Sequence, residues 1–289
     1  NLKVLPEQIK KAKEIAGGNG MVAVNIMAVT QLYETYVKTA CAAGVDAIIS
    51  GAGLPTELPK FAEGYDVALA PIVSSTKSAN VILKFWDKKY HRTADFLVIE
   101  GPLAGGHLGF SREQLEDIPS LDYDTEIQNI IALKQTYEEK YQTTIPVFVA
   151  GGMFTAEDAT HVMELGADGI QAATRFVATE ECDASDAYKQ AYVNASDDDV
   201  IIIKSPVGMP GRAIKNAFIE RMLTAPDKIS HCFNCLKACN PVTAPYCITQ
   251  ALINAVVGDL DNGLIFCGSR VGEIKEITTV PKLMQELTI

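Results

Sequence analysis

Positive charge is in short supply in this chain of 289 residues. Lys and Arg together number 25 against 36 Asp and Glu, so the formal net charge is −11. Non-specific binding to nucleic acid or to anionic membranes needs basic patches, and this composition disfavours both. The sequence also lacks any run of about 18 apolar residues, the minimum for a membrane span. We therefore expect neither a nucleic acid nor a membrane as a partner.

The cysteine content argues against a disulfide framework. The chain has seven cysteines, an odd number, and it is too large to need disulfides for stability. We therefore expect a reducing, cytoplasmic location. Apolar residues, by contrast, make up 48% of the chain, enough to build a large core as one large domain or two small ones. With 21% charged residues, the chain resembles neither a disordered segment nor a coiled coil.

Short apolar runs alternate with helical patterns along most of the sequence. The runs are rich in Val, Ile and Ala without polar alternation, which is typical of strands covered on both faces. One of the helices begins with Thr155 as N-cap and has Asp158 three residues on, a variant of the capping box. The predicted strands are 21–28, 45–53, 67–75, 95–101, 145–152 and 169–177, and the predicted helices are 30–43, 78–90, 125–141 and 155–165.

Two joints between a helix and a strand share one pattern. The stretches CAAGVDAIIS and MELGADGIQA each end a helix at a glycine, Gly44 or Gly166, and turn through Asp into a strand. Glycine readily adopts the left-handed conformation that closes a helix. The repeated joint favours serial βα units and a parallel sheet. Most strands start about 22 to 28 residues apart, near the interval of a (β/α)8 barrel.

We therefore predict an α/β fold, a TIM (β/α)8 barrel over 1–178 with a C-terminal helical extension over 179–289. Only six strands precede residue 178, and the first helix, LPEQIKKAKEIA, has no strand ahead of it. An open six-stranded parallel sheet would expose two edges, so we expect two further βα units ahead of Asn1. The stretch HLGFSREQLEDIPSLDYD is expected to be an extended loop, a common place for lids.

The extension over 179–289 is expected to contain a strand, helices and a cysteine-rich segment packed on the barrel. In DVIIIKSPVGMPGRAIKN, we expect a strand that runs into a Pro/Gly loop. Helices are expected at AFIERMLTA and at about 247–257.

Histidine is scarce too, and one of the four lies in EGPLAGGHLGF, directly after a strand-like run. In a parallel barrel the carboxyl ends of the strands form one face, where active sites lie. The glycines of AGG and the hydroxyl of QAATR predict an anion site there, since bare N–H groups at a helix start bind anions. Alternatively, these glycines only allow a tight turn. The strand ends at this face are Asn25, Ser50, Ser74, Glu100, Gly151 and Thr174, with His107 on the loop above them.

Two of these motifs together carry a family resemblance. EGPLAGGHLG and VFVAGGMFTAEDATHVMELGADGIQAATRFV resemble the nitronate monooxygenase family, formerly called 2-nitropropane dioxygenases. The resemblance runs from residue 1 to about 225 and implies an FMN-dependent TIM barrel, a fold and cofactor shared with flavin-dependent enoyl-ACP reductases. It also implies that two βα units, with a glycine-rich flavin contact, normally precede the point where this sequence starts.

The resemblance also assigns roles to individual residues. It implies that His107 is the catalytic histidine, that Asn25 lies beside the flavin ring and that the glycines at 105 and 106 lie against its face, where any Cβ would clash. Glu100 stands where the monooxygenases often have glutamine and the enoyl reductases often have glutamate. The implied FMN phosphate site consists of Gly151, Gly152, Gln171, Ala172, Ala173 and Thr174.

Two features near the C-terminus stay open. Arg212 in SPVGMPGRAIKN meets either an anionic substrate or a surface carboxylate. The stretch CFNCLKACNPVTAPYC has ligand-like spacing for Zn or an Fe–S cluster, although its intervening residues favour a structured helical turn with plain structural cysteines. The metal-ligand candidates are Cys232, Cys235, Cys239 and Cys247.

The resemblance leaves three functions to compare. The first is oxidation of alkyl nitronates or nitroalkanes by O2, with FMN as the cofactor and a small molecule as the substrate. The second is an FMN-dependent NAD(P)H enoyl-ACP reductase, which Glu100 and the apolar Leu108 favour. The third is a non-catalytic barrel that binds flavin or phosphate. Whether the chain forms a homodimer is left open.

Overall fold

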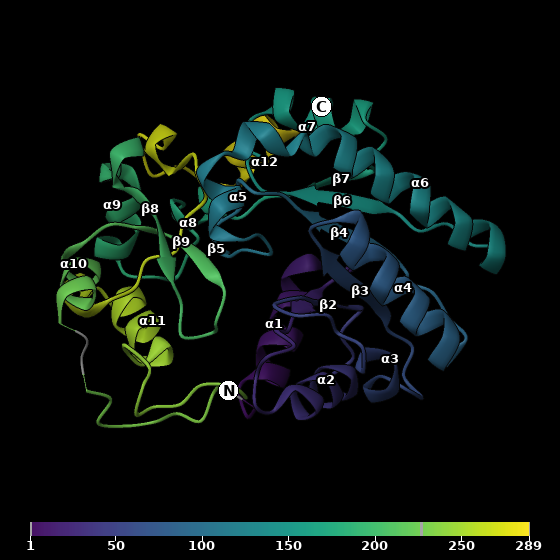
Figure 1. Ribbon diagram of the computed structural model, residues 1–289, viewed down its shortest axis with the longest axis horizontal. Helices are drawn as coiled ribbons and strands as arrows, with labels where there is room; N and C mark the ends of the chain where they lie inside the picture. The colour runs from purple at the N-terminus through teal and green to yellow at the C-terminus, as the bar shows by residue number, and fades with distance from the viewer. Residues whose placement is uncertain (1, 226–227, 289) are drawn as a thin grey trace. The chain divides into compact units, whose positions relative to one another are not determined.

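The structure, a computed structural model, describes residues 2–225 and 228–288 (Figure 1). The chain divides by its internal contacts into two compact units. Unit 1 comprises the described residues within 1–99, 123–148 and 166–168. Unit 2 comprises those within 100–122, 149–165 and 169–289. Within the described ranges, no helix combines the length and the apolarity that crossing a membrane requires.

Six strands form a sheet in the order β1-β2-β3-β4-β6-β7. The first four pair in parallel, with Ala23 opposite Ala47 and Ile72 opposite Val98 as examples of the register. Each strand lies inside one of the six apolar runs identified in the sequence, so the predicted α/β class with parallel strands is confirmed. The strands are β1 (Ala23–Asn25), β2 (Ala47–Ser50), β3 (Ala68–Val73), β4 (Leu97–Glu100), β6 (Val147–Ala150) and β7 (Gly169–Gln171).

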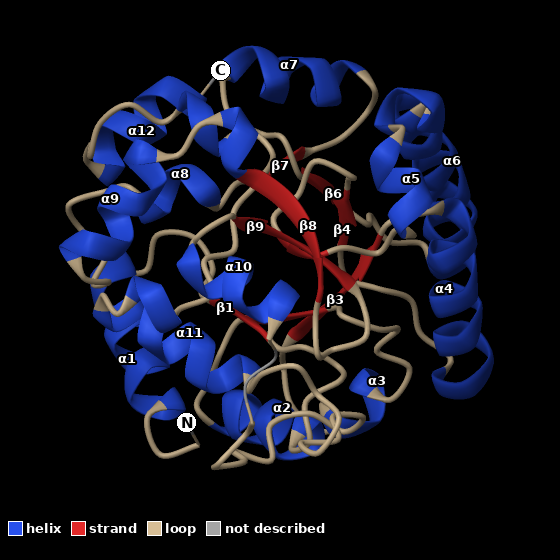
Figure 2. Ribbon diagram, turned by 60° about the vertical axis from the view of Figure 1, so that its left-hand side comes forward, coloured by secondary structure: helices blue, strands red, loops and turns tan. Residues whose placement is uncertain are grey.

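Unit 1 adds helices that cover its strands. Helices α4 and α6 lie side by side (Figure 2), and Asp87 on α4 accepts hydrogen bonds from Lys140 Nζ at 2.5 Å and the Tyr141 hydroxyl at 2.6 Å. The neighbouring Trp86 is fully buried. Gly44 and Gly166 have φ of +75° and +104°, which confirms the left-handed helix ends. The helices are α1 (Leu5–Ala16), α2 (Tyr33–Ala42), α3 (Leu58–Phe61), α4 (Thr76–Tyr90) and α6 (Tyr123–Tyr141).

Unit 2 contains an antiparallel sheet in the order β5-β9-β8 and most of the shorter helices. The predicted cap of α7 is confirmed, because Thr155 and Asp158 exchange the two hydrogen bonds of a capping box. The elements are β5 (Gly106–His107), α5 (Arg112–Glu116), η1 (Ile118–Leu121), α7 (Ala156–Glu164), α8 (Thr174–Val177), α9 (Asp186–Asn194), η2 (Asp197–Asp199), β8 (Val200–Lys204), β9 (Pro210–Ile214), α10 (Ala217–Thr224), α11 (Ile248–Val257), η3 (Leu260–Asn262), η4 (Val271–Glu273) and α12 (Val280–Leu287).

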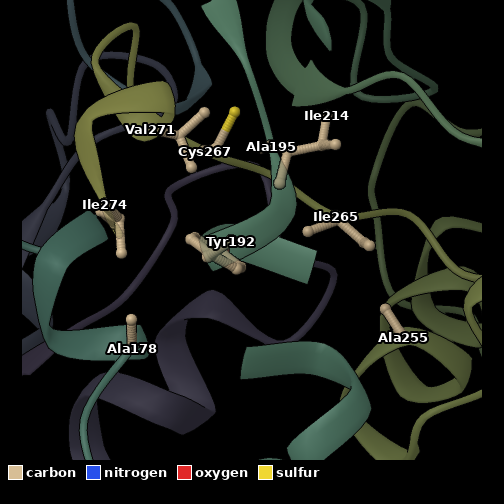
Figure 3. Close-up of a cluster of buried hydrophobic side chains, with 9 residues drawn as sticks. All are labelled: Ala178, Tyr192, Ala195, Ile214, Ala255, Ile265, Cys267, Val271 and Ile274. Carbon is tan, nitrogen blue, oxygen red and sulfur yellow. The ribbon is translucent and has the colours of Figure 1, made fainter. Parts of the chain in front are cut away.

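One apolar cluster of unit 2 fixes the segment 265–274 in place (Figure 3). Tyr192 of α9 lies in the cluster, and its hydroxyl donates to the backbone oxygen of Phe266 at 2.5 Å. Burial of this many apolar side chains is the main favourable term that holds an irregular segment against helices and strands. The cluster consists of Ala178, Tyr192, Ala195, Ile214, Ala255, Ile265, Cys267, Val271 and Ile274.

Three local predictions were wrong. The strand expected over 169–177 ends at Gln171, and α8 follows it. The stretch 107–124, expected to be a loop, contains α5 and η1. The Pro/Gly loop after β8 is short, because β9 starts at Pro210 and pairs with both β8 and β5. The helical turn expected in the cysteine-rich stretch is present as a single turn, because the Ala244 N–H donates to the Asn240 backbone oxygen at 2.8 Å.

Candidate active site

A pocket of about 290 Å³ lies within unit 2, at the ends of β4, β6 and β7. Three of its walls are the strand ends singled out in the sequence, and the fourth is the segment 266–270. The lining residues include Glu100, Leu103, Ala104, Gly105, Gly106, Ala150, Gly151, Gly152, Phe154, Gln171, Ala172, Ala173, Thr174, Phe266, Gly268, Ser269 and Arg270. The structure thus brings together every predicted cofactor residue except Asn25, which ends β1 in unit 1.

The glycines of this pocket are needed for two different reasons. A Cβ at Gly105 would lie 2.5 Å from the backbone carbon and oxygen of Cys267, so the close approach of another chain segment excludes a side chain. Gly106 has space for a Cβ, but its φ of +68° favours glycine. Gly151 combines both reasons, with φ of +93° and a built Cβ only 2.8 Å from the Ala104 nitrogen. The resemblance attributes the first two glycines to a flat cofactor, whereas a close contact within the chain already requires Gly105 and a positive φ already favours Gly106.

Two hydroxyls give the pocket polar groups suited to an anion. The Ser269 Oγ is buried and has no hydrogen-bond partner in the structure. Leaving a buried hydroxyl unbonded costs free energy, so this atom is suited to a ligand acceptor. Thr174 Oγ1 accepts from the Gly268 N–H at 2.9 Å, which ties the 266–270 segment to the end of β7. A phosphate fits such a set of hydroxyls and bare backbone, so these residues fit the flavin phosphate that the resemblance implies.

The sequence analysis missed the 266–270 segment. The sequence feature that could have revealed this segment is the tripeptide Gly268-Ser269-Arg270. Its contact with the pocket could not be expected from sequence spacing, because Gly268 lies 94 residues after Thr174. Arg270 forms an ion pair with Asp158 Oδ2 at 2.5 Å, and its Nη1 donates to the Gly152 backbone oxygen at 3.3 Å. It also pairs with Glu273. Arg270 therefore holds the glycine turn in place, and the carboxylates of Asp158 and Glu273 balance its positive charge.

Glu100 supplies the titratable carboxyl of the pocket wall. It is the last residue of β4, and burial raises its pKa to about 7, because desolvation disfavours the charged carboxylate. A carboxyl with a pKa near neutrality can both accept and return a proton at physiological pH. The resemblance implies a cofactor contact for Glu100, and its raised pKa also suits this carboxyl to proton transfer.

His107 lies on β5, next to the pocket wall rather than in it. Its Nε2 is 2.8 Å from the Ser205 Oγ, and its ring meets the pocket-lining Phe266 ring edge-on at 5.0 Å between centroids. Register pairing with Gly211 of β9 fixes its backbone. Burial lowers the pKa of His107 to about 4, so the imidazole is neutral at physiological pH. A neutral ring oriented by a hydroxyl can accept a proton or donate one hydrogen bond.

Arg212 does not meet a surface carboxylate, one of the two partners considered for it. Its side chain is only 3% exposed, which excludes a surface carboxylate as its partner. The guanidinium donates to the backbone oxygen of Ala104. Arg212 therefore holds the glycine-rich loop 104–106 against β9, and burial lowers its pKa.

The four candidate metal ligands lie in the cysteine-rich stretch 232–247. All seven cysteines are free, and Cys232 is exposed whereas Cys235, Cys239 and Cys247 are half-buried. Among the residues that the structure describes, no group of three or more His, Cys, Asp or Glu could hold a metal ion.

Comparison with known proteins agrees with this geometry. The family model described as nitronate monooxygenase matches residues 2–289. A probable nitronate monooxygenase from Staphylococcus saprophyticus is 32% identical over 135 residues, which cover 47% of this chain and 36% of that protein. The corresponding protein of Staphylococcus aureus strain Newman is 30% identical over 44% of this chain and 34% of its own length. The matched region thus spans about a third of these curated relatives.

Solved structures show the same fold. FabK from Thermotoga maritima superposes with a TM-score of 0.75 and 25% identity, covering 99% of this chain and 80% of that one. Nitroalkane oxidase from Streptomyces ansochromogenes superposes with a TM-score of 0.70 at 19% identity, over 99% of this chain and 84% of its own. At that identity the second likeness concerns the fold alone. Because the family model covers the chain from residue 2 to its end, the chain belongs to the nitronate monooxygenase family.

Proposed function

We propose that the protein is an FMN-dependent oxidoreductase that oxidises alkyl nitronates and nitroalkanes with O2. The observation that carries the proposal is the unit 2 pocket, where a bare glycine backbone, the partnerless Ser269 hydroxyl and the Glu100 carboxyl line one space. Membership of the nitronate monooxygenase family supports the reaction class. The whole activity and its substrate are part of the proposal.

The proposed cofactor contacts follow the lining of the pocket. The phosphate would lie on Gly151, Gly152, Ala173 and Thr174, with Gln171 and Ala172 beside it and the Ser269 hydroxyl as an added donor. FMN rather than FAD is proposed. The roles of Gly105, Gly106 and Glu100 beside the flavin, and of Asn25 in unit 1, remain predictions from the resemblance.

When bound, the flavin would supply the electron transfer between substrate and oxygen. The protein's own groups would orient the substrate and move its proton. His107 is neutral at physiological pH, so it can accept the proton of a neutral nitroalkane or donate a hydrogen bond to a nitro oxygen. Ser205 would hold the ring orientation through its 2.8 Å contact with Nε2. A nitronate has already lost that proton and needs only orientation.

A second function, NAD(P)H-dependent enoyl-ACP reduction, is favoured by two residues. Glu100 is a glutamate at the pocket wall, and Leu108, which follows His107, is 1% exposed. We would measure oxygen uptake with propyl nitronate against NADH oxidation with a crotonyl thioester, using one preparation. Faster turnover of the nitronate by at least tenfold supports the first function. Turnover of the thioester alone overturns it, and flavin binding without either turnover indicates a non-catalytic flavin barrel.

A further inference from the structure

A second cavity, of about 500 Å³, lies elsewhere in unit 2. The turn between β8 and β9, helix α10 and the cysteine-rich loop 238–246 form its walls, and none of its lining residues lines the glycine-rich pocket. Ile219, Met222 and Pro245 give it apolar surface. Its volume lies within the range of about 300–1,000 Å³ that is typical of small-molecule sites.

One buried hydroxyl links this cavity to the candidate acid–base group. Ser205 lines the cavity, is 3% exposed and has its Oγ 2.8 Å from Nε2 of His107. The His107 ring in turn contacts the Phe266 ring edge-on, and Phe266 lines the glycine-rich pocket. A molecule bound in the cavity would thus be separated from the His107 imidazole by the Ser205 hydroxyl.

A second buried hydroxyl lacks a partner. Tyr246 is 5% exposed and lines the cavity, and its hydroxyl oxygen has no hydrogen-bond partner in the structure. Its ring is held edge-on against Phe218, with the centroids 5.1 Å apart. Because a buried hydroxyl without a partner costs free energy, this one is suited to an acceptor that a ligand brings.

We propose that this cavity binds the chain of the substrate. The chain is apolar, of medium length, and carries an oxygen acceptor that receives the Tyr246 hydroxyl, while its reactive end points toward Ser205 and His107. The apolar walls would bind the methylenes, and Tyr246 would select chains that carry an oxygen. The inference rests on the proposed function and assigns to the cysteine-rich loop a role in substrate choice.

Binding of octanoate to the flavin-loaded protein, measured by calorimetry, tests the cavity without turnover. Ala244 lines the cavity, so Ala244→Phe should fill it and weaken binding at least tenfold. Val242 lies on the same loop, is 89% exposed and does not line the cavity, so Val242→Phe is the matched control and should bind within about twofold of wild type. Equal binding by both variants, or no binding by the wild type, overturns the proposal.

Tyr246→Phe tests the hydroxyl without disturbing the fold, because this hydroxyl makes no hydrogen bond to lose. Octanoate should bind about tenfold more weakly to this variant, as expected for loss of a hydrogen bond to a charged acceptor. The melting temperature should not fall below the wild-type value, because the variant removes a buried hydroxyl that has no partner. Unchanged octanoate affinity would remove Tyr246 from the site.

Turnover separates the inference from the proposed function. The kcat/KM for the nitronate of 8-nitrooctanoate should exceed that of 1-nitropropane by about tenfold or more, since each buried methylene adds affinity and the carboxylate supplies the acceptor for Tyr246. Ala244→Phe should erase this ratio. If octanoate binds as expected but no nitronate is oxidised, the cavity stands and the proposed function fails. If nitronates are oxidised without regard to chain length and octanoate does not bind, the function stands and the inference fails.

Discussion

At the scale of single residues, His107 and Glu100 are two buried titratable groups that burial shifts in opposite directions. Desolvation lowers the pKa of His107 to about 4 and raises that of Glu100 to about 7. Both shifts favour the neutral form, as expected for groups removed from water. Near neutral pH the imidazole is therefore uncharged, while the carboxyl is close to its titration midpoint.

The first prediction concerns His107→Ala. Turnover should fall by roughly 10²- to 10⁴-fold, the usual contribution of a positioned acid–base group, while flavin binding is retained. Flavin retention is expected because the glycine turns and the Ser269 hydroxyl remain. The measurement is kcat with propyl nitronate and with nitropropane, alongside the flavin content of the same preparation.

The two substrates divide the possible outcomes for this variant. A smaller loss with the nitronate than with the nitroalkane identifies proton removal as the role of the ring. Loss of flavin and of stability, with unchanged activity per bound flavin, would make His107 structural. A flavin-replete variant with full activity would exclude it from the mechanism.

The second prediction concerns Glu100 and the pH dependence of stability. The pKa of Glu100 is raised in the folded state, so between about pH 4.5 and 7 the folded chain binds more protons than the unfolded one. The stability that wild type owes to protonated Glu100 is therefore present at pH 4.5 and is lost as the pH rises toward 7. Glu100→Gln, which cannot ionise, should gain about 3 kcal/mol relative to wild type across this window.

Urea denaturation of both proteins at several pH values measures this difference. A constant difference between wild type and Glu100→Gln from pH 4.5 to 7 would show that burial does not shift Glu100. Folding lowers the pKa of His107 from 6.5 to about 4, so this residue makes both proteins more stable as the pH rises through that range. Its contribution opposes the trend from Glu100 equally in both proteins, so the comparison isolates Glu100.

At the scale of elements, the short strand β5 and the 266–270 segment determine the backbone of the site. The loop 104–106 is held by Arg212 of β9 from one side and approached by the Cys267 backbone from another. These contacts join distant parts of the chain, since Arg212 is 108 residues from Ala104 and Cys267 is 162 residues from Gly105. Rigid backbone of this kind pre-forms a binding pocket and lowers the entropy cost of binding.

The third prediction compares two adjacent glycines. Gly105→Ala should destabilise the protein by about 1–3 kcal/mol or more and lower flavin content, because its Cβ would meet the Cys267 backbone at 2.5 Å. Gly106→Ala has space and costs only the strain of a positive φ, about 1–2 kcal/mol. Thermal unfolding and flavin content measure both variants. A larger loss of stability for Gly106→Ala than for Gly105→Ala would contradict the close contact between Gly105 and the Cys267 backbone.

The sequence predicted the local elements well and the distant contacts poorly. The six parallel strands, the capping box at Thr155 and the left-handed Gly44 and Gly166 depend on neighbouring residues, and all are confirmed. Strand β9 was missed because a Pro- and Gly-rich sequence forms a strand only through its partners β5 and β8. The Ser269 hydroxyl was missed for the same reason, since long-range packing places it. The division into 1–178 and 179–289 remains a prediction.

At the scale of the whole molecule, the chain combines the α/β fold of its family with a pocket built from four separated segments. Membership of the nitronate monooxygenase family is shown along the chain, and the fold matches that of FabK from Thermotoga maritima. The acidic net charge of −11 favours solubility and disfavours polyanionic partners. The central claim that remains to be tested is that the glycine-rich pocket of unit 2 holds FMN through its phosphate.

Flavin affinity of three proteins, measured by fluorescence titration with FMN and with FAD, tests this claim most directly. Wild type should bind FMN more tightly than FAD, and Ser269→Ala should bind FMN about tenfold more weakly, because it removes a hydrogen bond to a charged phosphate. Ser230, which is exposed and outside the pocket, provides the control, and Ser230→Ala should bind FMN as wild type does. Preference for FAD, absence of flavin binding, or equal FMN affinity of Ser269→Ala and wild type would contradict the account.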